Sequence, residues 1–234
     1  MKAIVLAAGK GTRLHSEEFN LPKVLREALG KPLLGYVLSN ISFVNKKDIC
    51  IVIGYMGEKV RAYAGEDYAY AVQSEQKGTG HAVMMAKDEF EGYDGDVLIV
   101  YGDMPLFKEE TYKAICKKHK ESGAALTLLT ADIKNPPAYG RIIRDENGSV
   151  KDIVEEKDCT DEQKRITELN VGVYVADAKL MFETLKGLKN NNAQGEYYLT
   201  DLPKMLIAEG RKVESYTTYD AEEIVGVNTP EELA

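Results

Sequence analysis

The sequence predicts an α/β fold in which a mixed, mostly parallel sheet carries helices on both faces. Short, continuous apolar runs are typical of strands buried on both sides, and along this chain they alternate with segments of helical periodicity. Such alternation indicates βαβ units and hence a parallel sheet. The chain has 234 residues, of which 44% are hydrophobic and 29% charged, so a single domain can bury a sizeable core.

The first half of the chain supplies the parallel part of the predicted sheet. Apolar runs that read as strands lie at 3–6, 49–53, 97–101 and 124–129. Apolar residues recur at helical spacing over 33–41 and 82–90, which gives each helix one buried face. A further short strand precedes Gln73. This order of elements predicts a Rossmann-like arrangement.

From Pro136 onward the pattern changes to that of an antiparallel addition. Segments 140–144 and 150–154 flank the turn sequence Asp-Glu-Asn-Gly and predict a β-hairpin. A strand follows at 169–175, then helices at 180–185 and at 199–208, the last ending at Gly210. Open α/β sheets bind ligands at the carboxyl ends of their strands. We therefore expect functional residues in the hairpin and just after Leu6, Val72, Tyr101 and Val175.

Composition excludes several classes of function. Asp and Glu outnumber Lys and Arg by 38 to 30, and there is no basic run, which disfavours binding to nucleic acid or to a membrane surface. The three cysteines, Cys50, Cys116 and Cys159, are far apart and form no Cys-x-x-Cys motif. The first apolar run is too short for a signal peptide or a membrane span. We expect a soluble, cytoplasmic protein.

A glycine-rich segment, LAAGKGTRL at 6–14, follows the first predicted strand. Small residues let the backbone approach a phosphate, and Arg13 and Lys23 add positive charge beside it. The dinucleotide fingerprint fails because Leu14 stands where it needs a glycine, and the P-loop pattern is absent. A glycine-rich turn with solvated basic residues is the alternative interpretation. The position after the first strand favours a cradle for a triphosphate.

Segment 6–14 together with Lys23 resembles the signature of the sugar-1-phosphate nucleotidylyltransferases. Further blocks narrow the resemblance to the uridylyltransferase domain of the bifunctional N-acetylglucosamine-1-phosphate uridylyltransferase/glucosamine-1-phosphate acetyltransferases. These blocks are QSEQKGTGHA (73–82), YGDMPL (101–106), YGRI (139–142), VEEKD (154–158), ELNVG (168–172), NNAQGEYYLTD (191–201) and GVN (226–228). They occur in order over essentially the whole chain.

The resemblance implies a nucleotidyltransferase fold and Mg²⁺-dependent transfer from UTP to N-acetylglucosamine 1-phosphate. The product, UDP-N-acetylglucosamine, is a precursor of peptidoglycan. The resemblance also implies that Arg13, Lys23 and Asp103 are catalytic and that Asp103 and Asn228 bind the metal. The nucleotide-binding residues it implies are Leu6, Ala7, Ala8, Gly9, Gly11, Thr12, Lys23, Gln73, Gly78, Thr79, Tyr101 and Gly102. The sugar-binding residues it implies are Gly140, Glu155, Asn170, Tyr198 and Thr200.

The residue types suit these roles, although each has an ordinary structural alternative. The amide of Gln73 can both donate to and accept from an imide edge such as that of uracil. Carboxylate and amide oxygens suit Mg²⁺, whereas three scattered histidines without a Cys/His cluster disfavour zinc. Taken singly, the alternatives are a helix cap for Thr79, a turn for Asp103, a bend for Gly140, a solvated strand charge for Glu155 and a turn for Asn170.

The resemblance is incomplete in two respects. Val171 stands where many relatives have threonine, which removes one hydroxyl beside Asn170. The chain also lacks the hexapeptide-repeat β-helix of the bifunctional enzymes. We therefore expect one domain over 1–234, with a mainly nucleotide-binding half (1–135) and a mainly sugar-binding half (136–228), no acetyl transfer, and a monomer. Two other functions stay open: a sister transferase with another nucleotide or sugar phosphate, and a non-catalytic nucleotide-sugar-binding domain.

Overall fold

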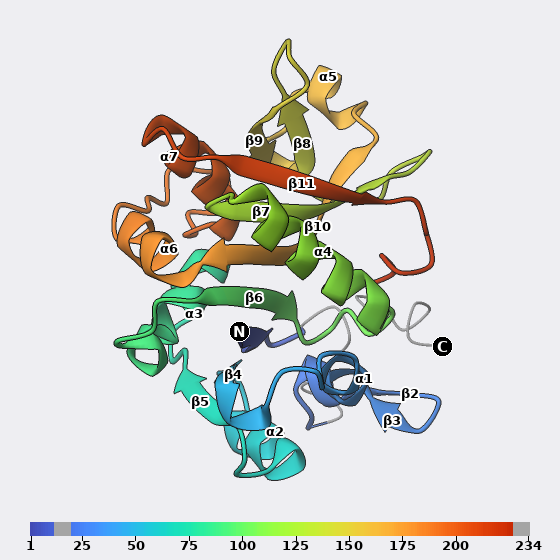
Figure 1. The fold of residues 1–234 in the computed structure, drawn as a ribbon. Helices are drawn as coiled ribbons and strands as arrows, with labels where there is room; N and C mark the ends of the chain where they lie inside the picture. The colour runs from blue at the N-terminus through green and yellow to red at the C-terminus, as the bar shows by residue number, and fades with distance from the viewer. Residues whose placement is uncertain (12–19, 227–234) are drawn as a thin grey trace.

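The computed structural model describes residues 1–11 and 20–226, which form one mixed sheet flanked by helices (Figure 1). The order of the strands is β11-β7-β10-β6-β1-β4-β5, while β8 pairs with β10 and β9 pairs with β8. The parallel part consists of β1 (Lys2–Ala7), β4 (Ile49–Ile53), β5 (Ala69–Val72) and β6 (Asp96–Tyr101). Its carboxyl ends therefore meet at one edge of the sheet.

The second half of the chain extends the sheet in mixed directions. Strand β10 (Glu168–Asp177) runs antiparallel to β6 and to β7 (Leu126–Asp132), and β11 (Val213–Thr218) runs parallel to β7. The hairpin of β8 (Arg141–Arg144) and β9 (Val150–Val154) joins β10 where Arg141 lies opposite Leu169. A separate small hairpin consists of β2 (Glu27–Ala28) and β3 (Lys31–Pro32).

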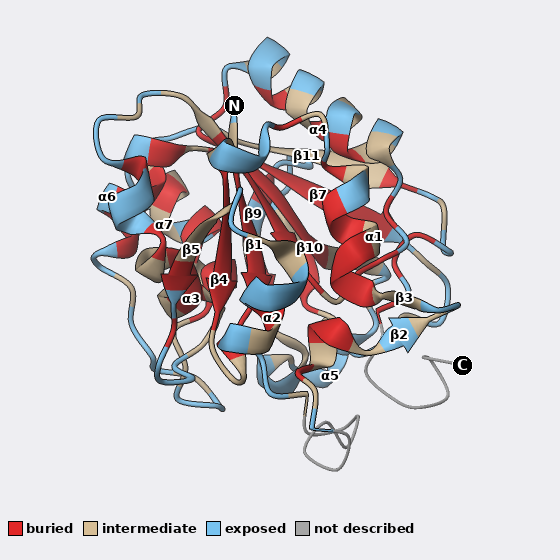
Figure 2. Ribbon diagram, turned by 90° about the horizontal axis from the view of Figure 1, so that it is seen from below, coloured by how far each residue is buried: buried red, intermediate tan, exposed pale blue. Residues whose placement is uncertain are grey.

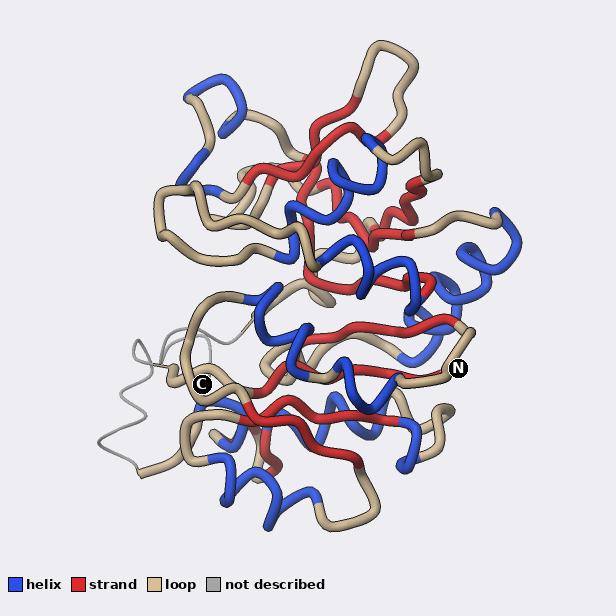
Figure 3. The backbone as a smooth tube through the Cα atoms, turned by 90° about the vertical axis from the view of Figure 1, so that its left-hand side faces the viewer, coloured by secondary structure: helices blue, strands red, loops and turns tan. Residues whose placement is uncertain are grey.

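Helices lie on both sides of the strands, as the tube view shows (Figure 3). One face packs against α1 (Leu33–Asn40), α2 (Gly57–Ala64) and α4 (Glu109–Ser122), and the other against α3 (Thr79–Met85), α6 (Ala178–Leu185) and α7 (Leu202–Ala208). Along β1, Val5 joins the first of these cores, while Ile4 and Leu6 join the second. Burial on both faces explains the uninterrupted apolar runs (Figure 2). The predicted fold class is confirmed.

Most predicted elements lie within a few residues of the observed ones, but several differ. The strand expected at 124–129 lies at Leu126–Asp132, because the buried hydroxyl residue Thr130 continues the ladder past the apolar run. The helices expected at 82–90 and 199–208 are each divided between an α-helix, α3 or α7, and a short 3-10 turn, Lys87–Phe90 or Leu199–Asp201. Elements α2, α4, the short α5 (Asp161–Lys164) and β11 were not predicted.

The expectation of functional residues just after Val175 is wrong. Because β10 runs antiparallel to β6, Asp177 lies opposite Asp96 at the beginning of β6. The carboxyl end of β10 therefore lies at the edge opposite to the carboxyl ends of β1, β5 and β6. The part of β10 that reaches those ends is its first half, where the register with β7 shifts between Asn170 and Tyr174.

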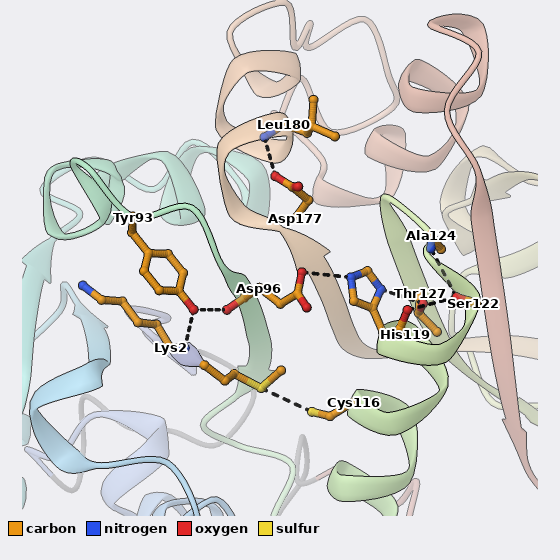
Figure 4. A network of polar contacts seen from close by, with 11 residues as sticks. Lys2, Tyr93, Asp96, Cys116, His119, Ser122, Ala124, Thr127, Asp177 and Leu180 are labelled. Atoms are coloured by element: carbon orange, nitrogen blue, oxygen red, sulfur yellow. Dashed lines mark hydrogen bonds and ion pairs between the residues drawn. The ribbon is translucent and has the colours of Figure 1, made fainter.

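At that opposite edge, His119 of α4 is buried between two strands (Figure 4). Its Nε2 lies 3.2 Å from Oδ1 of Asp96, and its Nδ1 lies 2.8 Å from Oγ1 of Thr127. This order of acid, imidazole and hydroxyl is that of a nucleophilic triad. Thr127 is completely buried, however, so no substrate can reach its hydroxyl. The contacts tie α4 to the sheet.

Among the described residues, none of the helices combines the length and apolar character needed to span a bilayer.

Candidate functional site

Two adjoining cavities open where the parallel strands end. The first, of about 230 Å³, is lined by Leu6, Ala7, Ala8, Gly9, Lys23, Val24, Gln73, Gln76, Gly78, Thr79, Ala82, Tyr101, Asp103 and Glu196. The second, of about 180 Å³, is lined by Tyr101, Asp103, Met104, Ala138, Tyr139, Gly140, Glu155, Asn170, Val171 and Gly172. Tyr101 and Asp103 belong to both linings. They lie at the end of β6 and just after it, so the end of that strand separates the two cavities.

The predicted residues are distributed between these cavities in two groups. Of those predicted to bind nucleotide, the first cavity is lined by Leu6, Ala7, Ala8, Gly9, Lys23, Gln73, Gly78, Thr79 and Tyr101. Gly102 instead packs behind it, donating its amide to the Leu6 carbonyl at 2.9 Å, and Gly11 is not part of either lining. Of those predicted to bind sugar, the second cavity is lined by Gly140, Glu155 and Asn170. Thr12, Arg13 and Asn228 lie outside the described residues.

Lys23 and Asp103 form an ion pair between the cavities. Lys23 begins a short 3-10 turn whose next two residues, Val24 and Leu25, are buried and hold the turn against the sheet. Nζ of Lys23 lies 2.5 Å from Oδ2 of Asp103, and the two side chains are 13% and 25% exposed. A cation and a carboxylate are thus presented together at the point where both cavities meet.

Gln73, Gly78 and Thr79 form one wall of the first cavity. Gln73 follows β5, its amide donates to the Ile53 carbonyl at 2.8 Å, and its side chain is buried. Gly78 has φ +109°, and a Cβ there would lie 2.6 Å from the Tyr197 carbonyl oxygen, so a side chain is excluded. Thr79 does not cap α3: its hydroxyl accepts from the Leu199 amide, at 3.0 Å. The wall therefore combines segments far apart in the sequence.

Glu155 and Asn170 supply hydrogen-bond acceptors to the second cavity. Oε1 of Glu155 accepts from the Thr200 hydroxyl at 3.0 Å. Burial raises the pKa of Glu155 above 4.5, and the nearby carboxylates of Asp158, Asp201 and Glu196 raise it further. Nδ2 of Asn170 donates to the Tyr174 hydroxyl at 2.8 Å, while its Oδ1 is buried and unpartnered among the described residues. A ligand with hydroxyl or N–H donors would satisfy both acceptors.

Two neighbouring phenols lie beside the two cavities. Tyr101, which lines both, is close to Thr79 of the first cavity and to Tyr174. Tyr174 in turn accepts from Asn170, and burial is the main cause that raises the pKa of both phenols. Both tyrosines are therefore neutral at physiological pH. Gly172 has φ +81°, and a Cβ there would overlap the Tyr101 ring, so this position also requires glycine.

Tyr139 ties the second cavity to the end of the described chain. Its hydroxyl donates to the Ile224 carbonyl at 2.9 Å and accepts from the Gly226 amide at 3.2 Å. The buried carboxylate of Glu223 accepts from the Lys108 amide and the Thr111 hydroxyl, both at 3.0 Å. The segment that leads to Asn228 is thus held beside the cavity that Tyr139 lines.

The described residues bring no three His, Cys, Asp or Glu side chains together around one point. A magnesium ion does not need such a group, because it is usually held by one or two carboxylates, by waters and by substrate phosphates. Asp103, partly exposed between the two cavities, fits the role of that carboxylate. Asn228, the predicted second ligand, lies outside the described residues.

Some residues of the site were recognised only as members of the matching blocks, and Tyr139 among them was expected at the sugar pocket. Gln76 and Glu196 line the first cavity, Met104 and Tyr139 line the second, and His81 contacts Gln73 from behind. Gln76 and His81 lie inside the recognised block 73–82, so the block itself was the available signal. Thr200 and Tyr198 were also predicted to bind sugar, but neither lines the second cavity. Thr200 is buried and donates a hydrogen bond to Glu155, and the Tyr198 hydroxyl accepts one from Gln194.

Comparison with known proteins gives concordant results. The model of the nucleotidyl transferase family matches residues 2–221. The bifunctional protein GlmU of Halalkalibacterium halodurans is 44% identical over 99% of this chain and 50% of its own length. GlmU of Streptococcus thermophilus is 46% identical over 99% of this chain and 50% of its own. GlmU of Alkaliphilus metalliredigens is also 46% identical, over 100% of this chain and 50% of its own. The chain thus spans about half the length of the curated relatives it matches.

A solved structure agrees with the architecture. A Bacillus anthracis protein assigned as a glucose-1-phosphate thymidylyltransferase, in complex with sucrose, superposes with a TM-score of 0.78. The superposition covers 100% of this chain and 92% of that one, at 22% sequence identity. At that identity the likeness establishes the fold.

Proposed function

Because the chain belongs to the nucleotidyl transferase family, we propose that it transfers the uridylyl group of UTP to N-acetylglucosamine 1-phosphate. The products would be UDP-N-acetylglucosamine and pyrophosphate. The observation that carries the proposal is the pair of cavities that meet at Tyr101 and Asp103. One presents an amide suited to a base and a cation suited to phosphates. The other presents acceptors suited to the hydroxyl and N–H groups of a sugar.

The nucleotide would occupy the first cavity. The Gln73 side chain would face the base, and the segment from Ala7 to Gly9 would approach the phosphates closely because its residues are small. Lys23 would neutralise charge on the phosphates, assisted by Arg13. The sugar would occupy the second cavity, where Glu155 and the unpartnered Oδ1 of Asn170 would accept hydrogen bonds from it. Under this proposal, residues 1–135 bind mainly the nucleotide and residues 136–228 bind mainly the sugar.

The chemistry is a single in-line displacement. An oxygen of the sugar phosphate, already ionised at neutral pH, attacks the α-phosphorus of UTP, and the bond to pyrophosphate breaks. No covalent intermediate with the protein is needed, so alignment of the two substrates and neutralisation of charge account for the catalysis. Mg²⁺, when bound by Asp103 and Asn228, would screen the phosphate charges. Lys23, held at Asp103, stabilises negative charge at the same place.

A panel of substrates tests this proposal. UTP, CTP, ATP and GTP would each be combined with N-acetylglucosamine 1-phosphate and with glucose 1-phosphate, and pyrophosphate release would be measured with Mg²⁺ present. We expect UTP and N-acetylglucosamine 1-phosphate to give the highest kcat/KM. Equal turnover across the panel, or turnover of another pair alone, would contradict the assignment. Light scattering of the same sample tests the further proposal that this segment is a monomer.

A further inference from the structure

The side-chain amide of Gln73 is held in one orientation by two contacts behind the first cavity. Its nitrogen, Nε2, lies 3.1 Å from the backbone oxygen of Gly78 and 2.9 Å from Nδ1 of His81. A backbone carbonyl can only accept a hydrogen bond, so the Gln73 atom that faces it must be the amide nitrogen. The orientation of this buried amide therefore follows from chemistry.

The same reasoning fixes the protonation of His81. One hydrogen of Nε2 is directed at Gly78, and the other is directed at the imidazole. Nδ1 of His81 must then accept, which requires a neutral ring with its proton on the other nitrogen. Both donors of the Gln73 amide are used by these contacts. Its carbonyl oxygen is the remaining polar group that the side chain can offer to the cavity.

We propose that His81 is a positioning residue for base selection. It holds the Gln73 carbonyl toward the bound base and thereby favours uracil, whose pairing edge is an imide, over cytosine, whose pairing edge is an amidine. The inference rests on the proposed function and adds the atom that discriminates. Uracil carries a donor, N3–H, on its pairing edge, whereas cytosine carries an acceptor at the same place. A fixed carbonyl bonds the first and repels the second, and a buried polar group left unmatched discriminates strongly.

The surroundings of His81 keep its ring neutral. The pKa of this half-buried ring is lowered from its ordinary 6.5, first by burial and then by Lys77, while Glu75 opposes the shift. Lys77 and Glu75 are paired with each other at 2.7 Å, and both are exposed. Glu196, which precedes Tyr197 in the chain, is a further charged group and lines the first cavity. At neutral pH the ring therefore accepts from Gln73.

Acid would disrupt this arrangement. Protonation places a second N–H on the ring, at Nδ1, which then faces an N–H of the Gln73 amide. Rotating the amide by half a turn does not relieve the conflict, because the amide oxygen would then face the Gly78 carbonyl oxygen. Because the pKa of His81 is lowered from the ordinary 6.5, base selection should hold at pH 6.5 and weaken only as pH falls through the lowered pKa.

Two variants separate the effect of losing the acceptor at His81 from the effect of protonating its ring. His81→Asn can place an oxygen close to the position of Nδ1 and does not titrate, whereas His81→Leu keeps a similar volume without an acceptor. For each variant and the wild type, binding of UTP and CTP without sugar phosphate and kcat/KM from pyrophosphate release would be measured from pH 8 down to the lowest pH at which the protein stays folded. At pH 7.5 we expect His81→Leu to lose roughly tenfold in UTP-over-CTP preference, through KM for UTP, with KM for sugar phosphate unchanged. We expect His81→Asn to keep its preference at every pH, while the wild type loses part of it in acid.

The outcomes distinguish this inference from the proposed function. Turnover of UTP with an unaltered preference in His81→Leu would overturn the role of His81. So would an equal acid loss in His81→Asn and the wild type. If His81→Leu does not fold, as judged by thermal unfolding, the pH profiles of His81→Asn and the wild type decide alone. Failure of the wild type to bind or use UTP would instead overturn the proposed function, and preferred use of a base without an imide N–H would overturn both.

Discussion

Replacing Glu155 by glutamine should weaken sugar binding while making the fold more stable. Glu155 lines the second cavity, accepts from the Thr200 hydroxyl at 3.0 Å and faces the carboxylates of Asp158 and Asp201. Among the described residues, no ion pair with a cation involves Glu155 to offset its burial and these neighbours. Such a carboxylate opposes folding, and donors from a bound ligand would compensate it.

The expected size of the effect follows from the charged hydrogen bond that the substitution removes. Glutamine keeps an oxygen for Thr200 but offers the ligand a neutral amide, which cannot accept as a carboxylate does. A hydrogen bond to a charged group contributes roughly 1.5–3 kcal/mol, so kcat/KM for the sugar phosphate should fall about 10- to 100-fold, mainly through KM. KM for UTP should change little, because Glu155 does not line the first cavity.

The effect on stability depends on pH, and its sign is set by the raised pKa. The folded chain holds the Glu155 proton more tightly than the unfolded chain, whose carboxyl has the ordinary value. The stability that Glu155 contributes is therefore present below about pH 4.5, the ordinary pKa of glutamate, and is lost as pH rises through the raised pKa. Glutamine does not titrate, so the Tm of Glu155→Gln should rise relative to the wild type between pH 4 and pH 8.

Thermal unfolding across this pH range and steady-state kinetics at pH 7.5 test the two effects separately. Glu146→Gln, in the exposed turn between β8 and β9, removes the same charge without burial and is the matched control. An unchanged KM for the sugar phosphate would refute the assignment of Glu155 to the sugar. A Tm difference that does not change with pH would refute the argument from burial.

Three further predictions concern other parts of the structure. Asp103→Asn should lower kcat by several orders of magnitude while metal-free binding of UTP, measured by calorimetry, changes far less; near-normal turnover would contradict the role of Asp103. His119→Leu leaves the buried Thr127 hydroxyl without its bond and should lower the free energy of unfolding in urea by roughly 1–3 kcal/mol. Both KM values should stay unchanged, and a change in either would connect this edge to the site. Gly172→Ala should lower Tm and raise both KM values, whereas Gly148→Ala, also at positive φ but in open space, should show only the backbone cost, about 1 kcal/mol. Equal effects of the two glycine variants would refute the close contact with Tyr101.

Those parts of the fold that depend on local pattern could be predicted from the sequence. The continuous apolar runs predicted β1, β4 and β6, because a strand covered on both faces has no polar position. The edge strand β11 was not predicted, since most of its residues are only half-buried. Helix α4 was not predicted either. Its buried residues Tyr112, Ile115 and His119 recur at helical spacing, but lysines and glutamates dominate the rest of the helix.

The site was predictable wherever a residue follows a parallel strand, as Gln73 and Asp103 do. The position of β10 between β6 and β7 was not predictable, because the pattern of a strand does not identify its partners. The contact between His81 and Gln73 could not be derived either. It depends on how the turn at Gly78 folds back, with φ +109°, against the backbone of Tyr197.

The antiparallel direction of β10 also explains how two substrates could be aligned without a moving part. Residues Tyr174–Asp177 pair with β6, and beyond the register shift Leu169 pairs with β8, so Asn170 stands just past the end of β6. Tyr101 and Asp103 lie at that same point. Asn170, an acceptor of the second cavity, and Asp103, a carboxylate that lines both cavities, are therefore fixed by neighbouring strands of one sheet. In a displacement that depends on alignment, an error of about 1 Å can cost a hundredfold in rate. A rigid sheet is better suited to hold that alignment than a pair of loops, because its ladder of backbone hydrogen bonds limits such displacements.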